Sequence, residues 1–214
     1  MTHLDRQVVI GDTRAESIRY PSTVTFREVI RRDRRANRTD IKSQLILFAF
    51  RMSHVVAARK TTNRLLWIAG IPMIAMYTVL VQWFLCVDIP AETQIGAGLK
   101  LYHGQSLVVN RHARIGQDCT LRHCTTIGSK TLNNGEEGPS PMIGDRVDVG
   151  SNAVIIGGII IGDDVVIGAG SVLIRDVPSG AVVAGNPARV LYSNSPKLQS
   201  FHEETLCTPS SNQT

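Results

Sequence analysis

The stretch "IGDRVDVGSNAVIIGGIIIGDDVVIGAGSVLI", residues 143 to 174, carries an aliphatic residue at every sixth position. A helix repeats about every 3.6 residues and a strand about every two, so neither element alone produces this period. Each unit must therefore combine a short strand with a turn. Small or turn-forming residues follow the aliphatic one, as in "IGDDVV" and "IGAGSV", and they fit a tight corner after each strand.

The six-residue period reaches back to residue 89 and is interrupted twice. The steps from Leu101 to Val109 and from Ile127 to Ile143 are eight and sixteen residues long. The second interruption, residues 129–142, is polar and contains Gly and Pro, which predicts an extruded surface loop of the kind that often carries function. The aliphatic positions are Ile89, Ile95, Leu101, Val109, Ile115, Leu121, Ile127, Ile143, Val149, Ile155, Ile161, Ile167 and Leu173.

This pattern resembles that of the hexapeptide-repeat transferases. The resemblance covers about residues 87–192 and implies a left-handed parallel β-helix, in which three hexapeptides form one triangular coil and the aliphatic residues point inward. The handedness follows from the resemblance, since the period alone does not give it. Residues 22–86 are rich in Arg and aliphatic stretches typical of helices. The expected fold is mainly β, a left-handed parallel β-helix preceded by an N-terminal α-helical region.

Four residues of the repeats are expected to share one column along the β-helix. Each is the third residue of its repeat and lies three repeats from the next one, so the four stack at the strand spacing of about 4.8 Å. Two imidazoles lie at one end and small side chains at the other. This suits a groove with chemistry at one end and an extended ligand along the rest. The four residues are His103, His123, Ser151 and Ala169.

The stretch "VDIPAETQIGAGLKLYHG", residues 87–104, resembles the segment of serine acetyltransferases that holds their catalytic Asp and His, with the same spacing and no gap. The resemblance implies that Asp88 and His103 are a catalytic pair. Acetyl transfer to an alcohol needs a base with a near-neutral pKa, which His supplies, and a carboxylate on its other ring nitrogen fixes the tautomer. The alternatives are that Asp88 only begins the first coil and that His103 is a polar corner residue.

The same resemblance implies acetyl-CoA as the donor and direct transfer without a covalent enzyme intermediate. It points to the backbone N–H groups at Gly128 and Ser129 for stabilising the oxyanion. The element "AGNPAR" resembles the one that ends the family's β-helix, and it places Arg189 either near the coenzyme A phosphates or in a structural role. Ser151 and Ala169 complete the candidate cofactor contacts. No metal is expected.

Departures from the serine enzymes bear on the acceptor. Those enzymes have an Asp directly before the catalytic His and an Arg-His pair that helps to hold the amino acid, whereas this chain has Tyr102, Pro139 and Ser140. Serine is therefore a poor fit. The phrases "LYHGQSLVVN" and "LRHCTTIGSKT" instead resemble acetyltransferases of bacterial exopolysaccharide and capsule clusters, the colanic acid type, which implies a saccharide acceptor. The candidate acceptor contacts are Tyr102, His123 and Lys130, and a surface role for His123 stays open.

The resemblance implies a homotrimer with sites between protomers, and the sequence leaves a dimer of trimers open. Serine O-acetylation remains the alternative activity. A zinc-dependent hydratase like the γ-class carbonic anhydrases is another, because His103, His112 and His123 supply the right residue type, although their spacing does not resemble that family's. A non-catalytic scaffold is a third alternative.

The N-terminal region is basic. Residues 1–64 carry 14 Lys/Arg against 6 Asp/Glu, while the whole chain has a formal net charge of +5. The run "RRDRRANR", residues 31–38, fits either a solvated helix face or an anionic membrane surface. No aromatic platform or recognised motif accompanies it, so we expect no nucleic-acid partner.

Two helices are expected before the repeats. "TVTFREVIRRDRRAN" forms the first, and "DIKSQLILFAFRMSHVVAARK" forms the second, with Asp40 as its N-cap. Residues 1–21 are expected to form a flexible arm and residues 193–214 a C-terminal tail.

Residues 65–86 contain no charged side chain and are long enough to cross a bilayer. However, Arg59, Lys60 and Arg64 would hold the preceding end in the cytoplasm and so place the repeats outside, away from acetyl-CoA. We therefore expect a helix broken or kinked near Pro72 and buried against the start of the β-helix and its symmetry mates. Peripheral contact with the inner face of the membrane stays open.

The four cysteines are Cys86, Cys119, Cys124 and Cys207. They show no CxxC spacing, and no signal peptide precedes them, which predicts reduced thiols in a cytosolic protein. Cys119 and Cys124 fall within the repeats, where small apolar side chains are expected.

Overall fold

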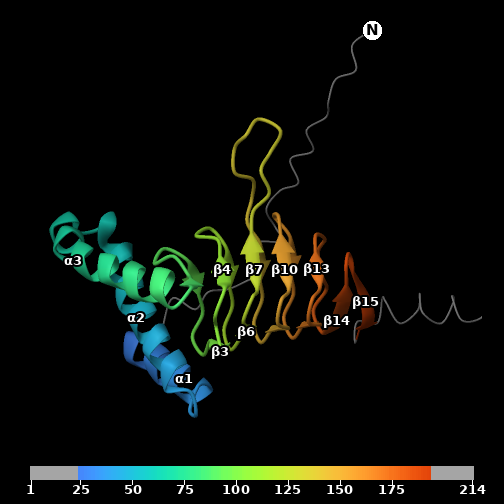
Figure 1. The fold of residues 1–214 in the computed structure, drawn as a ribbon, viewed down its shortest axis with the longest axis horizontal. Coiled ribbons are helices and arrows are strands. Elements are labelled where there is room, and N and C mark those ends of the chain that lie inside the picture. Colours follow the sequence, from blue (N-terminus) through green and yellow to red (C-terminus); the bar gives the residue numbers. More distant parts are fainter. Residues whose placement is uncertain (1–23, 194–214) are drawn as a thin grey trace, which may run out of the picture.

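The computed structural model describes residues 24–193. The predicted arm, residues 1–21, lies outside this range, as does the predicted tail after its first residue, Ser193. Within the range, a group of helices lies at one end of a long stack of short strands (Figure 1).

The two helices predicted before the repeats are confirmed. The Asp40 carboxylate caps the second one by accepting a hydrogen bond from the backbone N–H of Ser43 at 3.1 Å, and the Ser43 hydroxyl holds the pKa of this carboxyl below its usual value. The helical elements are α1 (Phe26–Ala36), α2 (Ile41–Ala57), the short 3-10 helix η2 (Ala58–Lys60), α3 (Arg64–Tyr77) and the π-helical η3 (Thr78–Phe84).

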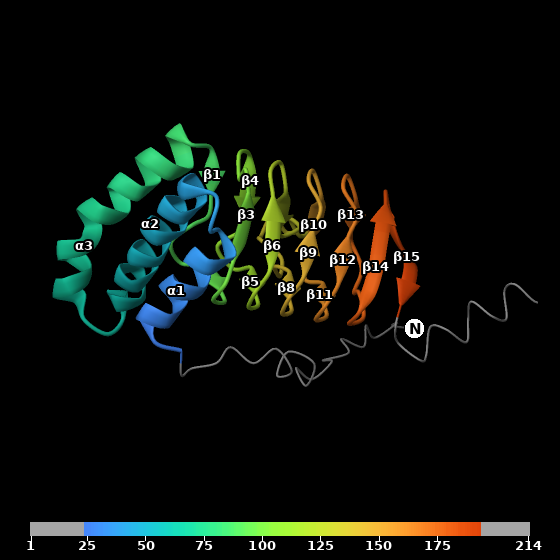
Figure 2. The same ribbon diagram turned by 90° about the horizontal axis from the view of Figure 1, so that it is seen from below.

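The β-helix predicted from the six-residue period is also confirmed. From β1 to β13, strands three apart in the sequence pair in parallel, so the chain visits three sheets in turn as a parallel β-helix (Figure 2), consistent with the left-handed winding of the family. At the end β14 pairs in parallel with β12 and antiparallel with β15. Sheet A contains β1 (Val87–Asp88), β4 (Leu107–Val109), β7 (Thr126–Gly128), β10 (Val154–Ile156) and β13 (Val172–Leu173). Sheet B contains β2 (Gln94–Ile95), β5 (Arg114–Ile115), β8 (Met142–Ile143) and β11 (Ile160–Ile161). Sheet C contains β3 (Lys100–Tyr102), β6 (Thr120–Arg122), β9 (Asp148–Val149), β12 (Val166–Ile167), β14 (Ala181–Gly185) and β15 (Ala188–Ser193).

The aliphatic residues that define the period form the core. All thirteen point inward, and the most accessible of them, Ile95, is only 8% exposed. A second inward position lies two residues earlier in each repeat and holds Cys119, whose burial raises the pKa of its thiol to about 12. The corresponding prediction for Cys124 is wrong, because this residue occupies a left-handed corner with φ of 57° and is exposed.

Glycine follows the aliphatic residue where the next coil approaches too closely for a side chain. A Cβ atom added to Gly116 would lie 2.5 Å from the carbonyl carbon of Gly144. Residues 129–141 leave this regular path between β7 and β8 and project from the body of the β-helix as predicted (Figure 1), whereas Met142, the last residue of the predicted loop, begins β8.

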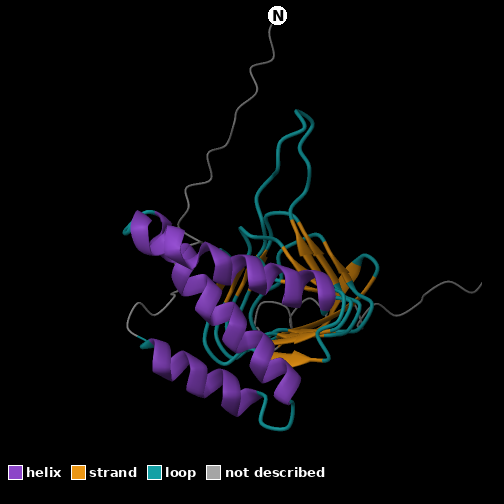
Figure 3. Cartoon of the chain, turned by 60° about the vertical axis from the view of Figure 1, so that its left-hand side comes forward, coloured by secondary structure: helices purple, strands orange, loops and turns teal. Residues whose placement is uncertain are grey.

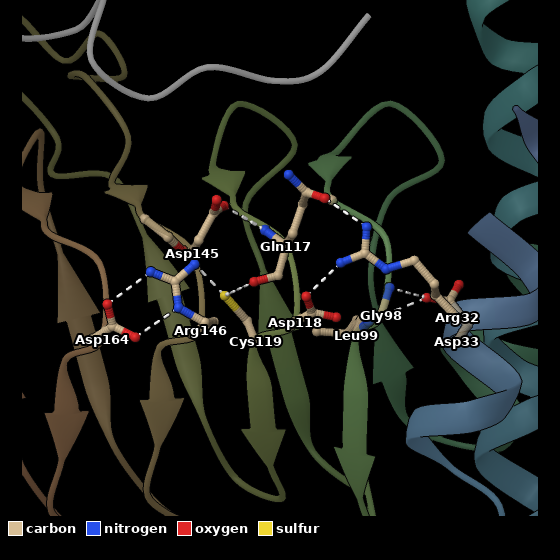
Figure 4. A network of polar contacts seen from close by, with 12 residues as sticks. Arg32, Asp33, Gly98, Leu99, Gln117, Asp118, Cys119, Asp145, Arg146 and Asp164 are labelled. Atoms are coloured by element: carbon tan, nitrogen blue, oxygen red, sulfur yellow. Dashed lines mark hydrogen bonds and ion pairs between the residues drawn. The ribbon is translucent and has the colours of Figure 1, made fainter. Parts of the chain in front are cut away.

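The helices cap the open end of the β-helix through hydrogen bonds to its backbone. Asp33 of α1 accepts from the N–H groups of Gly98 at 2.7 Å and Leu99 at 3.1 Å (Figure 4). Arg51 of α2 donates to the carbonyls of Ile95 and Gly96, both at 2.6 Å. An exposed strand edge offers unpaired backbone groups, and here side chains from three helices satisfy them. The further contacts are Asn37 to Leu99 and Leu101, Ser43 to Leu101, His54 to Ala91, and Tyr77 and Gln82 to Ile89.

A buried ion pair joins the two helices within this cap. Arg51 donates to the Asp33 carboxylate from Nε at 2.8 Å and from Nη2 at 3.3 Å, and both side chains are at most 5% exposed. The same carboxylate thus receives two guanidinium bonds and two backbone N–H bonds. Because every polar group of the pair has a partner, the desolvation of two charges is compensated.

The apolar segment after α2 differs from the prediction. Pro72 lies inside α3 and does not end it, and the helix passes into its π-helical turn only at Thr78. In α3 and η3 only Tyr77 and Val81 are buried, so the prediction that the segment is buried against the β-helix is wrong for the protomer. Figure 3 shows the helices lying across the end of the β-helix, and in Figure 2 α3 lies on the outer side of this group.

His54 gives the cap a pH dependence. Burial lowers the pKa of its imidazole below the ordinary value of 6.5, although the hydrogen bond to the Ala91 carbonyl partly opposes this. The unfolded chain therefore binds more protons than the folded one as the pH falls below about 6.5, so the stability contributed by the neutral ring is present above that pH and lost on acidification.

We expect the urea midpoint of the wild type to fall between pH 7 and pH 5.5 by more than that of His54→Gln. Equal decreases in the two proteins would contradict this.

Candidate active site

The structure brings His103 and His123 together at the corner between sheets C and A. Leu101 of β3 pairs with Leu121 of β6, so the residues two positions later occupy the same place in successive coils. The two imidazole rings meet edge to face with their centroids 6.0 Å apart. His103 has a φ of 64°, and this left-handed conformation turns the chain from β3 toward β4. The predicted imidazole end of the column therefore exists.

The column continues along the same corner. Val149 of β9 pairs with Ile167 of β12, which puts Ser151 and Ala169 in register. Backbone hydrogen bonds join successive members, from the Asn152 N–H to the His123 carbonyl at 3.1 Å and from the Gly170 N–H to the Ser151 carbonyl at 2.9 Å. Arg189 lies near the far end of this edge, because it pairs with Ala184 at the end of β14. Five predicted site residues thus follow one edge of the β-helix.

Asp88 lies in β1, the first strand of sheet A, next to the chain segment that carries His103. The N–H of Ser106 donates to the Cys86 carbonyl at 2.7 Å, and Val87 pairs with Leu107, so the corner at residues 103–106 runs beside the start of β1. The Asp88 side chain is exposed, and no hydrogen bond joins it to the His103 ring within the described chain. The negative charge of Asp88 adds to burial in raising the pKa of the Tyr77 hydroxyl.

Tyr102 stands on the outer face of sheet C, where two cations flank its ring. Nζ of Lys100 is 4.4 Å from the ring centroid, and the guanidinium of Arg122 is 5.2 Å from it. Arg122 also forms an ion pair with Asp148, whereas Lys100 forms none among residues 24–193. The surface beside His103 is therefore cationic. Sequence reasoning missed Lys100 and Arg122, because only the pairing of β3 with β6 places them around one ring.

His123 carries an unsatisfied polar atom. Its Nδ1 is buried and has no hydrogen-bond partner in the part of the chain that the structure describes. Buried side-chain nitrogens are nearly always paired, so this atom needs a group that the single protomer does not supply. Its place in the column, beside His103, makes it a candidate contact for an acceptor or for a neighbouring protomer.

Three other predicted residues lie at the opposite edge of sheet A. Gly128 ends β7, and Ser129 and Lys130 follow it at the base of the projecting loop, whereas His103 precedes the start of β4 in the same sheet. The predicted oxyanion and loop contacts are therefore not beside the imidazoles of the same protomer. His112 lies at this opposite edge too, just beyond β4, so the three histidines do not gather within a protomer.

The base of the loop is fixed by a polar cluster that sequence reasoning also missed. The Glu137 carboxylate accepts hydrogen bonds from the Asn110 side-chain amide and, at 2.9 Å, from the Ser129 hydroxyl. These bonds lower the pKa of Glu137. Asn110 and Glu137 are 27 residues apart and only the extruded loop brings them together. The described residues contain no cluster of three or more His, Cys, Asp or Glu side chains that could hold a metal ion.

Comparisons with known proteins agree with this geometry. The family model "Bacterial transferase hexapeptide (six repeats)" matches residues 140–175. The chain is 35% identical over 160 residues to "Putative colanic acid biosynthesis acetyltransferase WcaB" of Escherichia coli K12, which covers 74% of this chain and 96% of that protein. The chain belongs to the hexapeptide-repeat acetyltransferases. It is therefore an acyltransferase, as the sequence predicted.

The chain is also similar to serine acetyltransferases. The chain is 32% identical over 187 residues to the serine acetyltransferase of Mycobacterium tuberculosis, covering 87% of this chain and 73% of that protein. The solved structure of soybean serine acetyltransferase without ligand is 29% identical, with a TM-score of 0.65, and it covers 78% of this chain and 69% of that chain. Both groups of relatives share the fold and the acetyl transfer, and they leave the acceptor to be decided.

Proposed function

We propose that the protein transfers an acetyl group from acetyl-CoA to a sugar hydroxyl in bacterial exopolysaccharide or capsule biosynthesis. The observation that carries the proposal is the pair of imidazoles at one end of a continuous edge, with the small residues Ser151 and Ala169 along the remainder of that edge. Small side chains leave room for an extended donor, and the imidazoles supply proton transfer where its thioester ends.

In the proposed reaction His103 is the general base. Its ring takes the proton from the acceptor hydroxyl while the oxygen attacks the thioester carbon, and the tetrahedral intermediate then expels the coenzyme A thiolate, which receives this proton from the imidazolium. Asp88 would orient the ring and stabilise its charged form. The two groups lie on adjacent segments, and catalytic hydrogen bonds often close only when substrate is bound.

The opposite edges of sheet A favour a site shared between protomers. Gly128 and Ser129 lie at the edge of sheet A opposite to His103, so their N–H groups cannot stabilise an oxyanion beside the His103 ring of the same chain. In protomers associated side by side, the Gly128 edge of one protomer would meet the His103 edge of its neighbour. We therefore propose a homotrimer with three interfacial sites. The unpaired Nδ1 of His123 supports a contact from outside the protomer.

The acceptor proposed is a saccharide, with Tyr102, His123 and Lys130 as its contacts. Aromatic rings suit the apolar faces of sugars, and Tyr102 has a rigid ring with cations at its sides. The serine acetyltransferase relatives nevertheless support serine as the second candidate acceptor.

An acceptor panel separates these two activities. We expect release of coenzyme A from acetyl-CoA to be at least about tenfold faster with the preferred saccharide or oligosaccharide than with L-serine at equal concentration, because a single well-matched set of polar contacts contributes at least that factor. Serine turnover equal to that of every sugar tested would overturn the proposed acceptor.

We place the enzyme in the cytoplasm, where the donor is available, and at the inner face of the membrane, where lipid-linked sugars are assembled. The basic N-terminal region is compatible with such a surface.

A further inference from the structure

The helices lie at the end of the molecule opposite to β15 (Figure 2), and they expose many large apolar side chains. On α2, four exposed apolar side chains follow helical spacing, with exposed fractions from 38% to 72%. On α3 and η3, Leu65, Trp83 and Phe84 are more than 70% exposed. We name the exposed apolar residues of these helices the helical end face. They are Ile41, Leu45, Phe48, Val55, Leu65, Leu66, Ile68, Ile71, Met76, Val79, Leu80, Trp83 and Phe84.

The segment Arg64–Phe84 is long and apolar enough to cross a membrane, and only 11% of its most apolar window is buried. The core helix of a soluble protein passes the same test of composition but is mostly buried. Exposed apolar side chains in this number on two helices packed against each other mark an interaction site. The exposed side chains of this helix therefore contact a partner or a membrane outside the protomer.

Five exposed arginines adjoin the helical end face. Arg27, Arg31, Arg34, Arg35 and Arg38 line a groove on α1, and this groove shares Ile30, Arg34 and Gln44 with the neighbouring groove that contains Leu45 and Phe48. Among residues 24–193, only Arg31 of the five forms an ion pair, with Glu28. We name these five residues the arginine groove.

The charged side chains of α2, α3 and η3 are basic. Residues 41–87 contain no Asp or Glu, while Arg59 and Lys60 lie in η2 and Arg64 begins α3. The acidic residues of the described helical region are already engaged, Glu28 with Arg31, Asp33 with Arg51, and Asp40 as the cap of α2. The charged side chains of α2, α3 and η3 are thus all basic, and the acidic Asp88 and Glu92 near Tyr77 and His54 belong to the first coil of the β-helix.

We propose that the helical end face and the arginine groove dock the protein on an anionic lipid bilayer, with α3 and η3 lying in the headgroup region. Apolar side chains enter the boundary of the acyl chains while adjoining arginines contact lipid phosphates. A second copy is a poorer occupant, because two such ends facing each other would oppose their arginine grooves and repel. A bilayer has the opposite charge and is also apolar.

Docking at this end leaves the proposed reaction site accessible. The column that begins at His103 runs along the length of the β-helix and away from the helices, so the edge is not covered by the membrane. In the trimer of the proposed function, protomers associated side by side would present three end faces to one bilayer and increase binding through multivalency. Docking itself does not depend on the acetyl-transfer chemistry.

Flotation of the purified full-length protein with vesicles tests the proposal. We expect binding to vesicles with 30% phosphatidylglycerol in phosphatidylethanolamine and at least about tenfold weaker binding to pure phosphatidylcholine. Arg34→Glu/Arg35→Glu is expected to weaken binding at least about 25-fold, because each cationic side chain near an anionic surface contributes roughly a fivefold factor and each Glu adds repulsion. Phe48→Ser/Trp83→Ser should weaken it at least about tenfold. The matched controls at the other end, Leu191→Ser and Arg175→Glu, should bind like the wild type.

Fluorescence gives a second readout, because the only two tryptophans of the chain, Trp67 and Trp83, lie in α3 and η3. In Trp67→Phe, the emission of Trp83 should shift to shorter wavelength with anionic vesicles and be quenched by brominated lipid. No flotation by a monodisperse trimer would overturn the proposal. A hexamer that Phe48→Ser/Trp83→Ser converts to trimers would assign the face to a second copy instead, and resistance to carbonate extraction from cell membranes would indicate a span. Acetyl transfer to soluble acceptors is measured separately, so its failure leaves these results interpretable.

Discussion

His103→Ala is expected to lower kcat for acetyl transfer by at least about 10²-fold, and by as much as about 10⁴-fold, the range typical of a general base. The loss should appear in kcat and equally in kcat/KM for the acceptor, because the base acts in the transition state and not in binding. Steady-state assays with acetyl-CoA and the preferred saccharide measure it. Coenzyme A binding should be retained, which shows that the site is still formed.

His123→Ala is the matched control for this variant, because it makes the same change one coil further along the column, where the rings are 6.0 Å apart. It should raise the acceptor KM more than it lowers kcat. Asp88→Asn should lower kcat and leave both KM values nearly unchanged, as expected of a group that orients the base. A His103→Ala enzyme within tenfold of the wild-type kcat, or a His123→Ala enzyme with the larger kcat loss, would exclude His103 as the base.

Asp33→Ala is expected to destabilise the protein by about 3–5 kcal/mol, the usual effect of removing one partner of a buried ion pair. The substitution leaves the Arg51 guanidinium buried without its counterion, and it strips the N–H groups of Gly98 and Leu99 of their acceptor. For a chain of this size the melting temperature should fall by roughly 6–20 °C. Urea and thermal unfolding at one fixed protein concentration measure the change, since association also contributes to stability.

Asp164→Ala supplies the control. Asp164 and Arg146 form an ion pair at the same corner of the β-helix, and both side chains are more than half exposed (Figure 4). The loss of this pair should cost about 1 kcal/mol or less. Asp33→Leu/Arg51→Met should recover part of the stability, since no uncompensated charge is then buried. If Asp33→Ala and Asp164→Ala unfolded at the same urea concentration, the Asp33–Arg51 pair would not be what stabilises the helices on the first coil.

The sequence predicted the β-helix well because the signal is local and repeated. Each aliphatic residue at the six-residue spacing packs against the coils directly before and after it, so thirteen separate positions report the same geometry. Counting repeats was enough to place His103 beside His123, even across the eight-residue step. The 129–142 loop was predicted for a related reason, since a polar insertion between regular coils has nowhere to lie except outside.

Other features were not available from periodicity. Cys124 was misassigned because the sequence does not show that its corner takes the left-handed backbone conformation. The burial of α3 was predicted by rejecting a membrane span on topology, but an apolar helix that does not span can still face a bilayer or a partner as well as a core. The cationic surroundings of Tyr102 depend on which residues of two strands lie side by side.

By itself, the sequence determined the coiled architecture, the inward residues and the order of side chains along the candidate edge. All three follow from the six-residue spacing, which recurs in every repeat. Only the tertiary structure decided that Asp33 and Arg51 meet and close the first coil, that Gly128 lies across sheet A from His103, and that one helix remains uncovered. These depend on the angle at which helices dock and on the width of a sheet. Such quantities are set by contacts between segments far apart in the chain, and they leave no period in the sequence.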